Sequence, residues 1–146
     1  MKDLTKVSDM ISAGGQPSEA DIAALKAAGY RKIINLRRPG EQNQPLDPQA
    51  WGDVVTAAGL AYAHIPVDPT NLHPSSAAAV TQAVEEADGP VYIHCAAGGR
   101  AVTHALLADG KGKSADAVFQ KAEEVGAPIT AEGFKAFVVK VAGDGK

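Results

Sequence analysis

Cys95 is the only cysteine of the chain, and it directly follows a short apolar run of β-forming residues. Four small residues separate it from Arg100, and two of them, Gly98 and Gly99, allow backbone to approach a ligand closely. A strand, a tight loop and a helix in this order form an anion-binding nest, to which the helix N-terminus adds partial positive charge. The helix dipole and Arg100 would favour the thiolate of Cys95. The pattern predicts a sulfur nucleophile beneath a bound oxyanion, two of whose oxygens Arg100 can bind.

A lone cysteine is often inert core packing, so its neighbours decide the interpretation. His94 precedes it, a Gly-Gly-Arg run follows it, and the stretch lies where a strand gives way to a helix. These features favour a functional Cys95.

Strands and helices alternate along the chain around this stretch. The periodicity predicts strands at 10–13, 32–36, 61–67 and 91–94, and helices at 18–28, 48–58, 75–87, 100–108, 114–125 and 130–141. This order predicts an α/β fold with a mainly parallel central sheet flanked by helices, and it places the Cys95 loop at the carboxyl end of a central strand. We expect a single domain over residues 1–146, with a core at about 8–110 and a C-terminal helical part at about 114–142.

Composition narrows the possible partners. The formal net charge of −3 implies no general attraction to nucleic acid or to anionic membranes, so any phosphate must be attracted by a local site. One cysteine excludes an internal disulfide and a cysteine-rich zinc site, and the sequence offers no clustered metal ligands. The N-terminus has no apolar stretch behind its charges, and no run approaches the roughly 18 apolar residues of a membrane span. We therefore expect a cytoplasmic protein that needs no metal or cofactor.

Two polar loops follow strands and so reach the sheet edge where ligands bind in α/β folds. The first, at 37–48, carries Arg37, Arg38 and Glu41 as candidate rim residues, although such a loop can be charged merely because it is solvated. The second, at 68–74, begins with Asp68, which lies 27 residues before Cys95 with a helix and a strand between them. Asp68 is thus a candidate general acid, unless it only turns the chain ahead of a proline. His73 is the alternative acid.

Two other polar or aromatic residues are expected to be structural. His64 lies within a predicted strand, where a lone histidine is usually a satisfied structural residue. Trp51 lies in a predicted helix and is expected to pack in the core rather than to bind a ligand.

The chain resembles a known group of enzymes. His94-Cys95, the glycine-bearing loop and Arg100 are similar to the signature of cysteine-dependent protein tyrosine and dual-specificity phosphatases. A bacterial phosphatase-like family, the phosphatase-like domain of beta-lactamase-hydrolase-like proteins, is a closer match. Its pattern appears, in order, in Gly15-Gln16-Pro17-Ser18, Ile33-Ile34-Asn35-Leu36-Arg37, Gly40-Glu41, His64-Ile65-Pro66-Val67 and His94-Cys95…Gly98…Arg100.

This resemblance implies a tyrosine phosphatase-like fold and hydrolysis of a phosphate monoester, carried by a protein or a small molecule, through a cysteinyl-phosphate intermediate. Cys95 would be the nucleophile and Arg100 would stabilise the phosphoryl oxygens, while Asp68 resembles the general-acid aspartate in position. The substrate-binding set would be His94, Ala96, Ala97, Gly98, Gly99 and Arg37. Within that set, we expect His94 to hold the loop and support the thiolate by hydrogen bonding rather than to touch substrate.

Two departures keep other functions open. The general signature has five residues between the cysteine and the arginine, whereas this chain has four, as in the active loop of rhodanese-type sulfurtransferases. The residue after Arg100 is Ala101, where those phosphatases commonly have Ser or Thr, so an assisting hydroxyl would be missing or would come from Thr103. The alternatives are therefore sulfur transfer through a Cys95 persulfide and phosphate binding with little activity.

Overall fold

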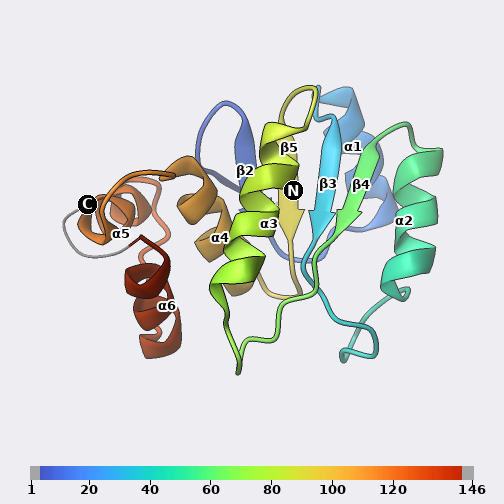
Figure 1. Ribbon diagram of the computed structural model, residues 1–146. Coiled ribbons are helices and arrows are strands. Elements are labelled where there is room, and N and C mark those ends of the chain that lie inside the picture. Colours follow the sequence, from blue (N-terminus) through green and yellow to red (C-terminus); the bar gives the residue numbers. More distant parts are fainter. Residues whose placement is uncertain (1–3, 143–146) are drawn as a thin grey trace.

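The structure is a computed structural model that describes residues 4–142, and a five-stranded sheet runs through its centre (Figure 1). The strands are β1 (Thr5–Lys6), β2 (Ile11–Gly14), β3 (Lys32–Asn35), β4 (Ala61–His64) and β5 (Val91–His94). They lie in the order β1-β2-β5-β3-β4, and only β1 is antiparallel to its neighbour. The expected mainly parallel α/β fold is confirmed, with β5 and its Cys95 loop at the centre of the sheet.

Helices cover both faces of this sheet. They are α1 (Glu19–Ala27), α2 (Pro48–Ala57), α3 (Pro74–Glu85), α4 (Gly99–Asp109), α5 (Ala115–Glu124) and α6 (Glu132–Ala142). Residues of α1 and α2 pack with Ile33 and Tyr92 on one face, whereas residues of α3, α4, α5 and α6 pack with Ile34 and Ile93 on the other. Successive strand residues point to opposite faces, so β3 and β5 are buried on both sides. Each such fully buried side chain contributes about 1.5–3 kcal/mol to folding.

The element boundaries differ from the predicted ones where proline or capping intervenes. β4 ends at His64 rather than Val67, because Pro66 has no N–H to continue the ladder. Beyond His64, the N–H groups of Ile65 and Val67 still donate at 2.9 Å, to the carbonyls of Asn35 and Leu36 respectively. β1 was not expected, since two residues carry too little pattern to mark a strand. Helix α6 begins at Glu132, later than predicted. The N–H of Lys135 donates to the carbonyl of Ala131, whereas a helix capped by Thr130 would have the N–H of Phe134 donate to the carbonyl of Thr130.

The cap of α3 was also assigned wrongly from the sequence, which favoured Ser75 or Ser76. In the structure His73 is the N-cap, and its Nδ1 accepts a hydrogen bond from the Ser75 N–H at 3.1 Å. Pro74 occupies the first turn, where its missing N–H costs nothing.

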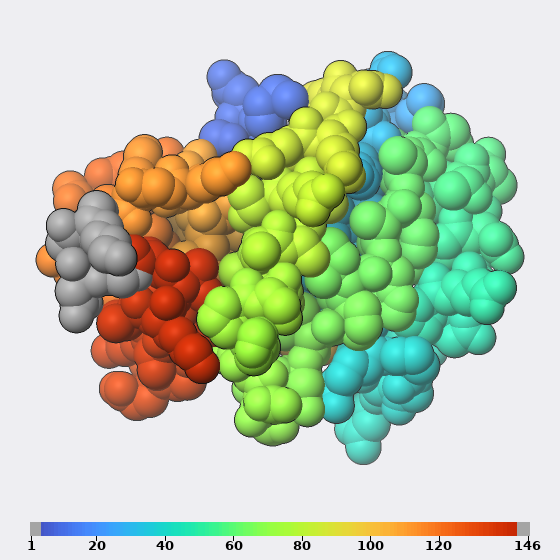
Figure 2. Space-filling model, viewed as in Figure 1, coloured from blue at the N-terminus to red at the C-terminus, as the bar shows by residue number. Residues whose placement is uncertain are grey.

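The carboxyl ends of β2, β5, β3 and β4 meet at one edge of the sheet, at the lower side of Figure 1. The loops that follow β3 and β4 therefore lie near the loop that follows β5. Figure 2 shows the first two loops, in cyan and green, forming the lower rim of the molecule, and α5 and α6 forming a lobe beside α3. Within residues 4–142, no helix is both long and apolar enough to cross a bilayer.

The capping role of His73 gives a test of how the loop before α3 is held. We expect His73→Ala to lower the free energy of unfolding by about 1 kcal/mol, because it leaves a first-turn N–H without its acceptor. Ser75→Ala is the comparison variant. It removes the contact of the Ser75 hydroxyl with Nδ1 of His73 at 3.0 Å but keeps the backbone N–H that donates to His73, so it should change stability by less than about 0.5 kcal/mol. Urea denaturation measures both. A loss of stability in the Ser75 variant without one in the His73 variant would contradict the assignment of His73 as the N-cap.

Candidate active site

The loop after β5 is shaped by one glycine. Gly98 adopts a φ of 117°, in the left-handed region, and it is the N-cap of α4. In this conformation its N–H donates to Sγ of Cys95 at 3.1 Å. A Cβ at this position would make only an ordinary contact, 3.5 Å from the carbonyl carbon of Gly14 in β2, so the positive φ is what favours glycine. The turn that brings backbone over the sulfur therefore requires glycine at position 98.

Other N–H groups of the loop are available to a ligand. The carbonyl of Ala96 accepts from the N–H of Gln16 at 3.0 Å, which ties the loop to the segment after β2. Among the described residues, no acceptor is found for the N–H groups of residues 96, 97 and 99–101, which include the first turn of α4. These groups and the Cys95 sulfur form what we call the cradle. Unpaired N–H groups at a helix N-terminus are suited to bind an anion.

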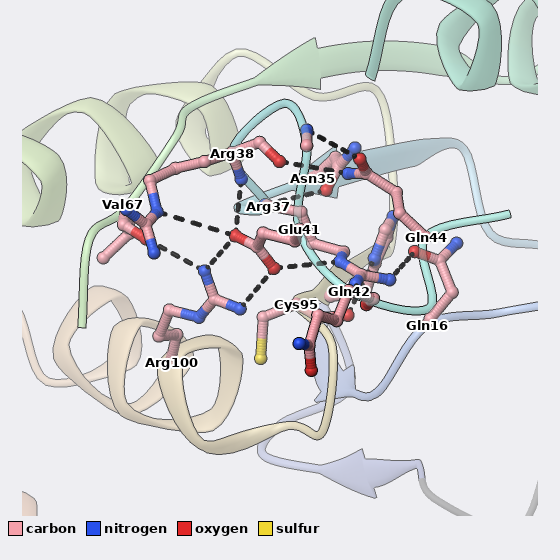
Figure 3. A network of polar contacts seen from close by, with 12 residues as sticks. Gln16, Asn35, Arg37, Arg38, Glu41, Gln42, Gln44, Val67, Cys95 and Arg100 are labelled. Atoms are coloured by element: carbon pink, nitrogen blue, oxygen red, sulfur yellow. Dashed lines mark hydrogen bonds and ion pairs between the residues drawn. The ribbon is translucent and has the colours of Figure 1, made fainter. Parts of the chain in front are cut away.

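Arg100 lies over the cradle in a fixed orientation. Its Nη1 donates to Oε2 of Glu41 at 2.7 Å and to the carbonyl of Val67 at 2.9 Å, and its Nη2 donates to Oε1 of Glu41 at 2.9 Å. A guanidinium has five N–H donors, and these three bonds use three of them. The Nε–H and the second Nη2–H, which lie along one edge of the group, remain for another partner. Figure 3 shows the guanidinium beside the sulfur of Cys95. Arg100 can therefore present a second planar pair of donors to an anion bound over the sulfur.

Glu41 is the residue on which this arrangement converges (Figure 3). Besides Arg100, its carboxylate accepts from Nε of Arg37 at 3.1 Å and from the backbone N–H of Arg38 at 2.7 Å. Burial would raise the pKa of Glu41, but the hydrogen bonds from Arg100, Arg38 and Arg37 outweigh it and lower the pKa to about 2. Hydrogen bonding to Glu41 is in turn the main reason that the pKa of Arg100 is raised. Both groups are charged at neutral pH.

Arg37 was expected to bind substrate, but its side chain is buried beneath the loop after β3. Its side chain is 2% exposed, and its three guanidinium nitrogens donate to Glu41, to Oε1 of Gln16 and to the carbonyl of Gln42. Arg37 therefore holds Glu41 and the surrounding loop from below. The buried side chain and its three hydrogen bonds within the protein favour a supporting role for Arg37 over contact with substrate.

Asp68 lies at the rim, directly after Val67, whose carbonyl accepts a hydrogen bond from Arg100. Its Oδ2 is 3.7 Å from Nη1 of Arg38, and its Oδ1 accepts from the hydroxyl and N–H of Thr70. The hydrogen bonds from Thr70 lower the pKa of Asp68, with smaller contributions from the charges of Arg38 and Arg100. The structure thus brings Asp68 into the neighbourhood of Arg100, as the topology suggested, and leaves its carboxyl partly exposed to solvent.

His94 supports the loop from within the sheet. Its Nε2 accepts a hydrogen bond from Nε1 of Trp51 at 3.1 Å, so in the neutral ring the proton lies on Nδ1, which is 3.3 Å from the carbonyl of Cys95. Burial lowers the pKa of His94 to about 3. His94 therefore holds the loop, as expected, but as a neutral ring bonded to the Cys95 carbonyl rather than to the sulfur. Trp51 is core packing, as expected, and its polar contact to His94 was missed.

Two further side chains complete the surroundings of the loop. Thr103, the candidate assisting hydroxyl, donates to the carbonyl of Gly99 at 2.9 Å. His104 is fully buried; its Nδ1 contacts the carbonyl of Arg100 at 2.8 Å and its Nε2 contacts the hydroxyl of Ser76 at 2.8 Å. Burial lowers the pKa of His104 to about 4. Both residues thus hold the first turn of α4.

Comparison with known protein families and curated sequences matches this chain to one family. The family model described as "Beta-lactamase hydrolase-like protein, phosphatase-like domain" matches residues 3–111. Beta-lactamase hydrolase-like proteins of Agrobacterium fabrum and Xylella fastidiosa (strain Temecula1) are 36% identical over 105 residues and 34% identical over 100 residues, which is 71% and 68% of this chain. The chain spans about a quarter of their length, 24% and 23% respectively.

Solved structures share the fold. A DUF442 protein of Shewanella putrefaciens CN-32, described as a candidate phosphatase, superposes with a TM-score of 0.78 at 26% identity, over 95% of this chain and 90% of that one. The active form of Tk-PTP superposes with a TM-score of 0.77 at 16% identity, over 96% of each chain. The fold is therefore that of the tyrosine phosphatase-like cysteine phosphatases.

The two buried, neutral histidines predict that acid destabilises the fold. The pKa values of His94 and His104, about 3 and about 4, lie below the value near 6.5 of an unfolded histidine. Below pH ~6.5 the unfolded chain binds protons that the folded chain does not, so stability falls as pH falls, by up to about 1.4 kcal/mol per pH unit for each histidine.

Urea unfolding between about pH 7.5 and 5, where most carboxylates stay ionised, measures this slope. His104→Gln should flatten it, because one of the two titrating groups is gone. An unchanged slope in that variant would show that His104 does not remain neutral when folded.

Proposed function

The chain belongs to the family of the beta-lactamase hydrolase-like protein, phosphatase-like domain, and on that premise we propose that it hydrolyses phosphate monoesters through a cysteinyl-phosphate intermediate. The observation that carries the proposal is the placement of Cys95. Its sulfur lies under the Gly98 N–H, beside the free edge of Arg100 and at the N-terminus of α4. A phosphoryl group bound there would have its phosphorus above the sulfur and its oxygens against N–H donors.

In the first step the thiolate of Cys95 attacks phosphorus. The S–P bond forms as the bond from phosphorus to the ester oxygen breaks, and Asp68 gives its proton to the departing oxygen. In the second step Asp68 takes a proton from water, whose oxygen attacks phosphorus. The S–P bond breaks, inorganic phosphate forms, and the thiolate is restored. Arg100 and the N–H groups of the cradle stabilise the charge on the equatorial oxygens in both steps.

The choice of Asp68 as proton donor rests on the alternatives around it. Glu41, with its pKa of about 2 and its bonds to three arginines, stays ionised and cannot donate a proton near neutral pH. The Nδ1 of His73 is already used, because it accepts the capping hydrogen bond from the N–H of Ser75 at the start of α3. The hydrogen bonds from Thr70 lower the pKa of Asp68 as well, but its carboxyl is partly exposed at the rim, and charge repulsion from a bound phosphate dianion would raise that pKa and favour the protonated form.

Sulfur transfer is the second candidate function, because two features of the loop favour it. Only four residues separate Cys95 from Arg100, and the Thr103 hydroxyl, which would assist thiolate release in a phosphatase, is bonded to Gly99 instead. Assay of the purified protein with an aryl phosphate, and in parallel with thiosulfate and cyanide as the sulfur acceptor, separates the two functions. Turnover of thiosulfate alone would establish sulfur transfer.

The role of Asp68 is tested with two esters. Asp68→Asn should slow hydrolysis of an ester with a poor, alkyl leaving group by roughly 10²–10⁴-fold, because that oxygen needs a proton to depart. An activated aryl phosphate should be affected much less. Cys95→Ser is the control that should abolish both reactions, since an alcohol at its ordinary pKa is a poor nucleophile. Equal losses on the two esters, or no loss, would remove Asp68 from the mechanism.

The role of Glu41 is tested by removing its charge. Glu41→Gln weakens the bidentate contact that orients Arg100, and charge-assisted hydrogen bonds contribute about 1.5–3 kcal/mol. We therefore expect kcat/KM for an aryl phosphate to fall roughly 10- to 100-fold. Glu85→Gln is the matched control. Glu85 also forms an ion pair, with Lys111, but that pair lies on the exposed surface and does not touch Arg100. Equal activity of the two variants would show that Glu41 does not position Arg100.

A further inference from the structure

Arg38 lies at the rim of the site and has no role in the reaction as described so far. Its backbone is held on both sides, because its N–H donates to Oε2 of Glu41 at 2.7 Å and its carbonyl accepts from Nε2 of Gln44 at 3.1 Å. Its side chain, by contrast, is 45% exposed, and within residues 4–142 its guanidinium makes ion pairs but no hydrogen bond. The guanidinium of Arg38 is therefore held in place by charge.

Two ion pairs place this guanidinium between the carboxylates of Glu41 and Asp68. Its Nε is 3.7 Å from Oε2 of Glu41, and its Nη1 is 3.7 Å from Oδ2 of Asp68. The same oxygen of Glu41 accepts from Nη1 of Arg100 at 2.7 Å, and Figure 3 shows both guanidinium groups reaching this carboxylate. Arg38 thus joins the loop that orients Arg100 to the loop that carries Asp68.

The two carboxylate oxygens of Asp68 have different surroundings. Oδ1 accepts from the N–H of Thr70 at 2.9 Å and from its hydroxyl at 2.7 Å. Because Oδ1 is engaged as an acceptor, a proton taken up by Asp68 is carried by Oδ2, the oxygen that faces Arg38. A guanidinium has donors but no acceptor. The proton on Oδ2 therefore finds no acceptor on Arg38 and can be given to an ester oxygen.

Arg38 is the cation in ion-pair contact with Asp68 among the described residues. The hydrogen bonds from Thr70 lower the pKa of Asp68 most, and the charges of Arg38 and Arg100 lower it further. Lys140 of α6 lines a small hollow together with Thr70, but it forms no ion pair with Asp68 in the described part of the chain. The charge that acts on Oδ2 at short range is therefore that of Arg38.

We propose that Arg38 is a positioning residue for Asp68: it holds the proton-carrying oxygen Oδ2 at the rim, and its charge sets the pH above which Asp68 no longer donates. The inference rests on the proposed function, because it takes Asp68 as the proton donor. The positive charge also favours the carboxylate form of Asp68, which the second step requires when a proton is taken from water. Arg100 thus binds the phosphoryl oxygens, while Arg38 acts on the reaction through Asp68.

The pH dependence of kcat for an alkyl phosphate tests this role, because kcat reports the groups that titrate in the enzyme–substrate complex. In the wild-type chain kcat should fall at high pH, as Asp68 loses its proton. Arg38→Gln removes the cation, so the fall should occur at a pH higher by roughly 0.5–1 unit. Arg38→Lys keeps the charge and should leave the fall where it is. Arg31→Gln, which removes an exposed arginine directly before β3, is the matched control and should also leave it unchanged.

Salt provides a second measure of the same charge. The side chains of Arg38 and Asp68 are 45% and 37% exposed, so dissolved ions screen the pair. The difference in pH between the wild-type chain and Arg38→Gln should therefore shrink in about 1 M NaCl. If Arg38 only supported the fold of the loop, Arg38→Gln would lower kcat at every pH without moving the fall, which would overturn the inference.

The outcomes separate the inference from the proposed function. If the wild-type chain hydrolyses no phosphate ester, the proposed function is wrong and the inference falls with it. If Asp68→Asn removes the fall at high pH while Arg38→Gln leaves it at the wild-type pH, the inference is wrong and the proposed function stands. A fall that persists in Asp68→Asn, or that moves equally in Arg38→Lys and Arg38→Gln, would also overturn the inference. Arg38→Met, which is neutral and unbranched, decides the matter if circular dichroism shows that Arg38→Gln is not folded.

Discussion

The ion pair between Glu41 and Arg100 is the interaction on which the candidate site depends. Its two hydrogen bonds, at 2.7 and 2.9 Å, join the loop after β3 to the first turn of α4. Both side chains are nearly buried, at 12% and 10% exposure, so each would be costly without the other. The pair also decides which edge of Arg100 remains for a ligand. Without Glu41, the guanidinium could turn toward solvent or toward the sulfur in several ways, and its donors would lose their fixed direction.

A second constraint reaches the loop through the sheet. Trp51 lies on α2, on the opposite face of the sheet from α4, and its indole N–H bonds the buried ring of His94. That contact fixes a neutral His94 with its proton directed to the Cys95 carbonyl. Within the sheet, the N–H of Cys95 donates to the carbonyl of Gly14 in β2 at 3.3 Å. The Cys95 backbone is therefore held by His94 and by the neighbouring strand β2, while the charged network orients Arg100.

Much of the fold and the loop after β5 could be predicted from the sequence, because the patterns that indicate them lie within short stretches of the chain. Alternating strands and helices predict a parallel sheet, and the run from His94 to Arg100 predicts the loop between β5 and α4 with Cys95 at its start. The Ser18–Asp21 capping box forms as its spacing indicates. The roles of Arg37, Glu41 and Trp51 could not be predicted in this way. Each depends on a partner 4 to 59 residues away, and a charged residue in a loop has the same sequence signal whether it contacts substrate or another side chain.

The central claim is that Cys95 carries the phosphoryl group during turnover, and trapping the intermediate tests it most directly. The wild-type chain is mixed with an activated aryl phosphate, quenched in acid within the first turnover, digested, and analysed by mass spectrometry. Our account predicts that the peptide containing Cys95 gains the mass of one phosphoryl group, and that this gain disappears once substrate is exhausted. Hydrolysis that proceeds with no phosphoryl group on Cys95 at any quench time would contradict the account. A persulfide formed on Cys95 from thiosulfate, with no turnover of the aryl phosphate, would also contradict it.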